Sequence, residues 1–422
     1  MPAISRGVNF CLLAFALASV RAEDRPLGPR ELLSELLQRN PEIQAARLRF
    51  EAATKRPSQL GTLPEPSAAY SNFGVGHPFS RLNASEFAYQ SFGVSQEFPF
   101  PGKLALASEE AKREADSEQQ KYQSAILDVT SRLKIAYYEW LTVNKAIDLT
   151  RKHSDLLGRF EEIARNRYIV GKGLQQDVLK AQLEVSTLEQ QLALLDEKRQ
   201  RAEAEIASLL AEPSIGLHAP TEIQPTSFSM SLDELLKATA DSPRVRAEQK
   251  MVDARAVGIN RSLKDFRPDF GASFQWLRTG TNFPDYYMAT VEVKIPIYYE
   301  RKQRYALEES YSRLNEAKQN YRASQQQAIF GVKDQYLSIQ SSDRILKLYK
   351  TTLLPQAQLT VDSSASAYEV GNIDFLTLVT NVTNLISLER QYFDEVARHE
   401  EAIARLEPVV GRELVPFGGT NQ

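Results

Sequence analysis

The sequence has almost no cysteine, because Cys11 is the single one among 422 residues. It lies in a short apolar run, 10–20, which follows Arg6 and precedes small residues that end at Ala22. A basic residue, an apolar run and a small-residue end indicate a secretory signal peptide over residues 1–22. The mature chain then lacks cysteine, which excludes disulfides and thiolate metal sites. Cys11 also lies too far before the cleavage point to become a lipidated N-terminus.

Excess charge, a membrane-spanning apolar run and metal-ligand spacing are missing as well. The formal net charge is -3, which gives no support to a nucleic-acid partner. The run 10–20 is too short to span a bilayer. The four histidines are scattered without ligand spacing, so we expect no bound metal and no cofactor. The Ser, Asp and His residues form no recognisable catalytic pattern, and we expect no enzyme.

Proline is absent from residues 102–212, where the sequence predicts one very long helical hairpin. Apolar residues recur there at alternating spacings of three and four, as in a coiled coil. Gly171 and Gly173 form the one cluster able to reverse the chain at low steric cost, which places the bend at 168–173. A helix over 103–167 has a length of about 100 Å at 1.5 Å per residue, so an elongated molecule is expected.

Two other stretches, 66–100 and 267–298, lack this pattern and are rich in aromatic residues, glycine and serine. The second stretch contains strict alternation of apolar and polar residues, which predicts strands at 268–278 and 287–297. The first predicts a strand pair ending near Phe98, with a less regular first member. Each run of about 10 residues is long enough for a tilted strand to cross a membrane.

The second half of the chain repeats the first at a displacement close to 200 residues. Tyr168 and Gly171 at the first bend correspond to Tyr368 and Gly371 in the second half. Pro355 is expected to break or kink the third long helix, since proline removes a helical hydrogen bond. A tandem repeat of helix, strand pair and helical hairpin is therefore predicted.

The repeat defines two units and a tail. The first unit, residues 23–225, contains a helix, a strand pair at 66–100 and a hairpin at 102–212. The second unit, residues 226–408, contains a helix, a strand pair at 267–298 and a hairpin at 300–408. Residues 409–422 are expected to form a flexible tail.

Four strands per chain cannot form an open sheet in lipid, because the edge amides and carbonyls would lack hydrogen bonds. Two chains would give eight strands and a filled interior, whereas three would give twelve strands and a lumen. The predicted fold is an α+β membrane protein, a trimeric 12-stranded β-barrel continued by a long α-helical barrel of coiled-coil hairpins.

From about residue 30 to 408 the chain resembles the TolC-type outer-membrane efflux family. The matching features are the tandem repeat, Tyr-x-x-Gly at both bends, the segment Phe98-Pro99-Phe100-Pro101-Gly102-Lys103 and the step Leu354-Pro355-Gln356-Ala357. The resemblance implies a passive exit duct, a homotrimer in the cell outer membrane whose helical barrel projects into the periplasm. It also implies two partners, a periplasmic adaptor (membrane fusion) protein and an inner-membrane efflux pump of the RND type. The Pro-Gly-Lys segment is similar to the branch that serves heavy-metal cation pumps.

The resemblance places the periplasmic entrance and the adaptor-docking site at the two bends. The residues that it implies there are Tyr168, Gly171, Asp177, Tyr368, Gly371 and Asp374. In the family a tyrosine, an acid and a basic residue hold the entrance shut, and Tyr368 and Asp177 match the first two. Ile373 occupies the basic position, while Thr377 and Thr380 replace acids that form constriction rings, so Asp374 is the nearest acid.

Simpler interpretations stay open for these residues. Each glycine can serve only to end a helix, each tyrosine can pack a bend, and Asp177 can be a favourable acid at a helix start. A periplasmic coiled-coil adaptor or scaffold is the alternative function, although it would need one hairpin only. A secreted enzyme is the weakest alternative.

Overall fold

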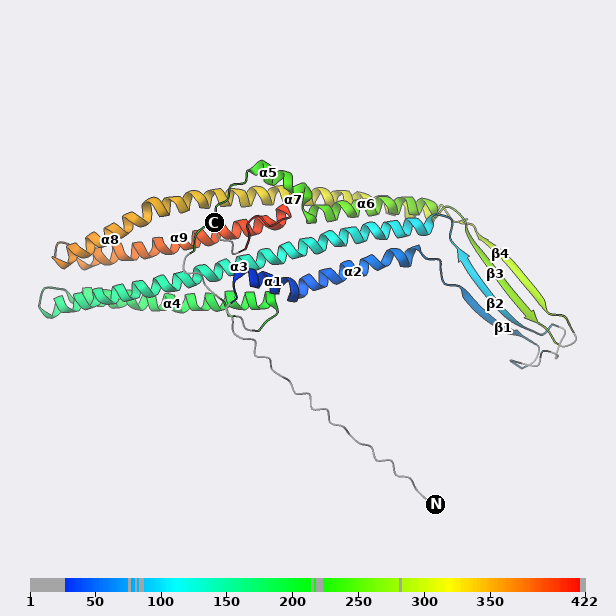
Figure 1. Ribbon diagram of the computed structural model, residues 1–422, viewed down its shortest axis with the longest axis horizontal. Helices are drawn as coiled ribbons and strands as arrows, with labels where there is room; N and C mark the ends of the chain where they lie inside the picture. Colours follow the sequence, from blue (N-terminus) through cyan, green and yellow to red (C-terminus); the bar gives the residue numbers. More distant parts are fainter. Residues whose placement is uncertain are drawn as a thin grey trace, which may run out of the picture.

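The computed structural model describes residues 27–417, apart from 75–76, 80–81, 83–86, 214–215, 218–222 and 281–282. The expected signal peptide, 1–22, lies outside the described residues. The molecule is long and narrow, with a β-sheet at one end and two helical bends at the other (Figure 1). Among the described helices, none has an apolar stretch long enough to cross a membrane.

The longest element is α3 (Lys103–Ile169), a helix of 67 residues that spans most of the shaft and begins next to the sheet. α4 (Gln175–Leu210) returns along it. The second hairpin consists of α7 (Gln303–Leu348), the π-helical turn η3 (Tyr349–Leu353), α8 (Leu354–Glu369) and α9 (Phe375–Val410). α3 packs against α9, which joins the two hairpins along the shaft.

Shorter helices complete the half of the shaft nearest the sheet. α2 (Pro41–Gly61) and α6 (Pro243–Lys264) pack on α3, while α1 (Pro29–Arg39), α5 (Leu232–Ala238) and the 3-10 turn η2 (Thr239–Asp241) lie near the middle. Asn40 caps α2 by accepting hydrogen bonds from the backbone N–H groups of Glu42 and Ile43. The Asn-Pro-Glu pattern in the sequence predicts this start, because it supplies a cap, a first-turn proline and a first-turn acid.

The four strands form one antiparallel sheet in the order β1-β2-β3-β4. They are β1 (Ser67–Phe73), β2 (Tyr89–Phe98), β3 (Asp269–Arg278) and β4 (Tyr286–Lys294). The pairing of β2 with β3 joins the two repeats. β4 ends at Lys294, whereas the sequence alternation extends to 297, because Pro296 has no N–H to continue the ladder.

The register gives the sheet one apolar and one polar face. A row across the first face contains Tyr70, Phe92, Trp276 and Tyr287, and the next row contains Ala68, Val94, Phe274 and Ala289. The opposite face contains the row Ser67, Ser95, Ser273 and Thr290. Alternation of this kind is typical of a strand with lipid on one side and water on the other.

Pro355 is accommodated by a local change in helix type. A proline clashes with the carbonyl four residues earlier and cannot donate to it, and η3 widens the helix at that position. The predicted kink is therefore a π-helical turn between α7 and α8, after which the helix continues to the second bend.

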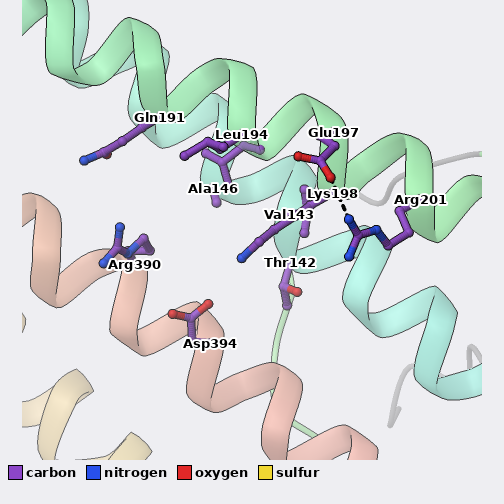
Figure 2. Close-up of a pocket in the computed structure, with 11 residues that line it drawn as sticks. Thr142, Val143, Ala146, Gln191, Leu194, Glu197, Lys198, Arg201, Arg390 and Asp394 are labelled. Carbon is purple, nitrogen blue, oxygen red and sulfur yellow. Dashed lines mark hydrogen bonds and ion pairs between the residues drawn. The ribbon is translucent and has the colours of Figure 1, made fainter.

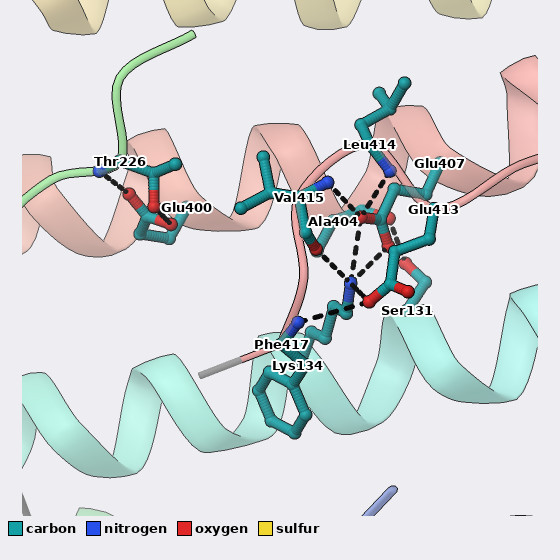
Figure 3. Close-up of polar contacts among 10 residues, drawn as sticks. All are labelled: Ser131, Lys134, Thr226, Glu400, Ala404, Glu407, Glu413, Leu414, Val415 and Phe417. Atoms are coloured by element: carbon teal, nitrogen blue, oxygen red, sulfur yellow. Dashed lines mark hydrogen bonds and ion pairs between the residues drawn. The ribbon is translucent and has the colours of Figure 1, made fainter. Parts of the chain in front are cut away.

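The end of the chain differs from the expected flexible tail over 409–422. α9 continues to Val410, and Phe417 is buried with its ring centroid 5.2 Å from that of Tyr137. Lys134 on α3 reaches this segment and donates to Glu407, Glu413 and the carbonyl of Val415 (Figure 3). Residues 411–417, called the C-terminal strap below, thus tie the second repeat to the first. Residues 418–422 lie outside the described residues.

Candidate functional site: the paired helical bends

The two bends lie together at the end of the shaft away from the sheet (Figure 1). One hydrophobic cluster is shared by both hairpins, with Phe160 and Ala164 from α3 packed in the same core as Phe375 and Leu378 from α9. The sequence repeat therefore brings the two predicted entrance segments into one site.

Each bend ends its first helix in the same way. Gly171 has φ +73° and Gly371 has φ +81°, conformations that L side chains rarely adopt. The next backbone N–H, of Lys172 or Asn372, donates at 2.8 Å to the carbonyl five residues earlier. This pattern satisfies the last carbonyls of the helix, so both glycines have a structural function in the bend.

The two tyrosines occupy different environments although they are equivalent in the repeat. Tyr168 is 47% exposed, whereas Tyr368 is 3% exposed. The ring centroid of Tyr368 lies 5.4 Å from that of Phe375, while the position equivalent to Phe375 in the first repeat is Gln175. The second bend therefore has an aromatic core that the first bend lacks.

Arg167 is the residue in this site that the sequence did not reveal. Its guanidinium carbon lies 4.7 Å from the ring centroid of Tyr368, and its Nη1 donates to the Tyr368 carbonyl. The expected position for a basic residue, two after Gly371, belongs to the second bend and contains Ile373. A basic group is present after all, but it is Arg167 of the first bend, 201 residues before Tyr368.

Asp177 influences Tyr368 through its charge, without a direct hydrogen bond between the two. Burial raises the pKa of Tyr368, the Arg167 charge lowers it and the Asp177 charge raises it. Within the described part of the chain, the Tyr368 hydroxyl has no hydrogen-bond partner. In one chain the pair is thus coupled through charge, while Asp177 occupies the first turn of α4, where a negative charge is favourable.

Asp374 caps the second helix of its hairpin. Its carboxylate accepts from the backbone N–H of Thr377 at 2.8 Å, and hydrogen bonds from the Thr377 side chain and backbone lower the pKa of Asp374. The equivalent position at the first bend is Leu174, which provides no side-chain cap. Thr377 and Thr380 are exposed and neutral, so this part of α9 presents hydroxyl groups in place of acids.

A second polar region lies farther along the shaft, where α3, α4 and α9 enclose a groove of about 440 Å³ (Figure 2). Lys198 on α4 faces Arg390 and Asp394 on α9, and Val143 and Ala146 on α3 also line the groove. Sequence reasoning missed it because its charges come from two helices far apart in the chain. Among the described residues, no group of His, Cys, Asp or Glu is placed to hold a metal ion.

Comparison with known proteins identifies the family. The model of the outer membrane efflux protein family matches residues 32–212 and 235–412. The chain therefore belongs to the outer membrane efflux protein family. A curated relative is the cobalt-zinc-cadmium resistance protein CzcC of Cupriavidus metallidurans, which is 22% identical over 289 residues, 68% of each chain.

Solved structures share the fold over nearly the full length. The outer membrane protein VceC of Vibrio cholerae has a TM-score of 0.76 and 18% identity, with 92% of this chain and 96% of that chain covered. The CusC channel has a TM-score of 0.79 and 16% identity, with 97% and 99% covered. These structures share the fold, and the family match identifies the protein as an outer-membrane efflux channel, in a family of transport proteins rather than enzymes.

Proposed function

We propose that three copies of this chain close a 12-stranded barrel in the outer membrane and form the passive exit duct of a tripartite efflux system. The observation that carries the proposal is the four-stranded sheet, which is open at both edges and apolar on one face. The proposed channel runs through the barrel and continues between the helices of the shaft.

The edges of the sheet argue for assembly. Within the described residues, β1 and β4 each pair on one side only, and all nine residues of β4 are exposed. Each unpaired backbone group costs several kcal/mol in hydrocarbon, on the order of what one hydrogen bond is worth there. Joining β4 of one copy to β1 of the next removes every edge, and three copies leave room for a lumen.

A periplasmic adaptor protein and an inner-membrane pump are the proposed partners. The two bends supply a docking surface, because they present exposed apolar side chains at the end of the shaft. These residues are Tyr168, Ile169, Val170, Leu174, Val370 and Leu376. The adaptor or scaffold alternative has less support, because the chain combines two hairpins with a sheet and belongs to an outer-membrane family.

Divalent metal cations are the proposed cargo. The relative CzcC is a cobalt-zinc-cadmium resistance protein, and the Pro101-Gly102-Lys103 segment resembles the heavy-metal branch. Deleting the encoding gene should increase sensitivity to cobalt, zinc or cadmium, with restoration by the wild-type chain. Unchanged tolerance to all three metals would contradict the proposed cargo but would not contradict the proposed channel function.

Assembly and conduction test the channel directly. Native mass spectrometry of the detergent-solubilised protein should give three times the mass of the mature chain, and the same sample should conduct in planar bilayers. A stable monomer that does not conduct would contradict the proposal.

A further inference from the structure

We propose that the junction between the sheet and the shaft binds the headgroups of anionic phospholipids through four basic side chains. These residues, called the basic collar below, are Lys264, Arg267, Arg301 and Lys302. The inference rests on the proposed channel, in which the sheet lies in lipid and the shaft lies outside it. The collar then meets the membrane leaflet from which the shaft emerges.

The boundary of the hydrocarbon falls at this junction. Beyond its last paired residue, the alternation of β4 adds two apolar residues, Ile295 and Ile297, which are 66% and 75% exposed. Tyr298 and Tyr299 follow and are exposed as well. Tyrosine is enriched at membrane–water interfaces because its ring is apolar and its hydroxyl is polar. The next three residues, 300–302, are all charged, so the hydrocarbon ends at the two tyrosines.

The collar is built from connectors that contact one another. The ends of α3, α6 and α7 meet the sheet at one end of the shaft (Figure 1). Nζ of Lys264, at the end of α6, lies 5.4 Å from the ring centroid of Phe100, which precedes α3. The ring centroid of Phe266 lies 6.5 Å from that of Tyr299, which precedes α7. The two halves of the collar therefore lie on adjoining segments, although they are distant in the sequence.

The acids beside the collar already have partners within the chain. Nζ of Lys103 lies 2.9 Å from a carboxylate oxygen of Asp269 and 3.5 Å from one of Asp265. Arg304 pairs with Glu300 at 3.2 Å. Among the described residues, no carboxylate pairs with any of the four collar side chains, and Arg267, Arg301 and Lys302 are exposed. Their positive charges are therefore available to a ligand from outside the chain.

An anionic phospholipid fits this combination of charge and position. A guanidinium donates two parallel hydrogen bonds to a phosphate, and an ammonium group binds it as a point charge. Each basic residue close to an anionic membrane surface strengthens binding about 5-fold. The exposed isoleucines and tyrosines lie beside the acyl chains of the same lipid, an apolar contact that free phosphate cannot make. The collar thus recognises the headgroup while the sheet contacts the hydrocarbon.

Native mass spectrometry of the detergent-solubilised trimer tests the collar. The probes are phosphatidylglycerol, which is anionic, and phosphatidylcholine, which is zwitterionic, with the same acyl chains. Wild type should retain more phosphatidylglycerol. The collar variant should bind it at least about 10-fold more weakly and lose the preference; it combines Lys264→Gln, Arg267→Gln, Arg301→Gln and Lys302→Gln.

A matched control removes four exposed lysines from the shaft, away from the junction, and should keep the wild-type preference. It combines Lys318→Gln, Lys333→Gln, Lys347→Gln and Lys350→Gln. If the collar variant fails to assemble, Arg301→Gln with Lys302→Gln replaces it, because both side chains are exposed and lack ion pairs among the described residues. This pair should also reduce the preference for phosphatidylglycerol.

Three results would overturn the collar. They are equal retention of the two lipids by wild type, an unchanged preference in the collar variant or its replacement, and displacement of phosphatidylglycerol by excess inorganic phosphate, which would make free phosphate the ligand. Higher salt should weaken the preference, because it screens exposed charges. A wild-type protein that neither forms trimers nor conducts would contradict the channel. A conducting trimer without lipid preference would contradict only the collar, so the two failures are distinguishable.

Discussion

Lys134 on α3 and Glu407 on α9 form a buried ion pair between the two repeats, with both carboxylate oxygens 2.8 Å from the ammonium. Their side chains are 4% and 3% exposed. Glu407 also accepts from the backbone N–H groups of Leu414 and Val415 in the C-terminal strap (Figure 3). Burial raises the pKa of Glu407 although Lys134 and both amides lower it, so its charged form depends on those partners.

Lys134→Met should destabilise the assembled protein by about 3 to 5 kcal/mol, because it leaves the Glu407 charge buried without its partner. The effect should appear as a lower unfolding temperature in detergent. Lys121→Met is the control, since Lys121 pairs with Glu118 near the surface and should cost about 0 to 1 kcal/mol. The double change Lys134→Met with Glu407→Gln should recover part of the loss. Equal unfolding temperatures for the two single variants would contradict the prediction.

The cap at Asp374 predicts an acid-sensitive second bend. Because hydrogen bonds from Thr377 lower its pKa below 3.8, its contribution to stability is present above that value and is lost as the pH falls through the lower folded pKa. Unfolding temperatures of wild type and Asp374→Asn, measured from about pH 5 to about pH 2, should converge at the acid end. An asparagine keeps the cap without titrating, so a constant difference between the two proteins would argue against this role.

The two faces of β4 predict that arginine substitutions at neighbouring residues affect trimer assembly differently. Val291 lies opposite Ala272 on the apolar face, whereas Thr290 lies opposite Ser273 on the polar face. Val291→Arg should reduce trimer yield in membranes, since arginine facing lipid costs roughly 2 to 4 kcal/mol at mid-depth. Thr290→Arg should assemble better than Val291→Arg. The reverse order of yields would mean that the faces are exchanged.

The two glycines at the bends form a matched pair. Both have positive φ, so Gly171→Ala and Gly371→Ala should each lose about 1 to 2 kcal/mol locally, visible as faster hydrogen exchange in the bend. A Cβ at Gly171 meets nothing within 4 Å, whereas one at Gly371 crowds Arg167. Gly371→Ala should therefore speed hydrogen exchange in its bend more than Gly171→Ala does in the first bend. Equal acceleration in the two bends would contradict crowding by Arg167.

Sequence patterns predicted the elements that depend on local rules. Coiled-coil spacing and glycines located both bends, and alternation located the strands. The contact of Arg167 with Tyr368 was not predictable in this way, because periodicity describes the faces of one helix and not which ends meet across the repeat. The same holds for the C-terminal strap, which has no periodicity and is held by a buried lysine, Lys134, that resembles a surface residue in the sequence.

The open sheet has a consequence for how the protein reaches its membrane. In the proposed trimer, closing the barrel and associating the subunits are one event, so the stability of the membrane form depends on how many protomers are present. Until then each newly made chain carries two strand edges and an apolar face, which can pair with any other exposed strand. During biogenesis, trimer assembly therefore competes with aggregation. A protein that covers β1 and β4 during transit would favour assembly.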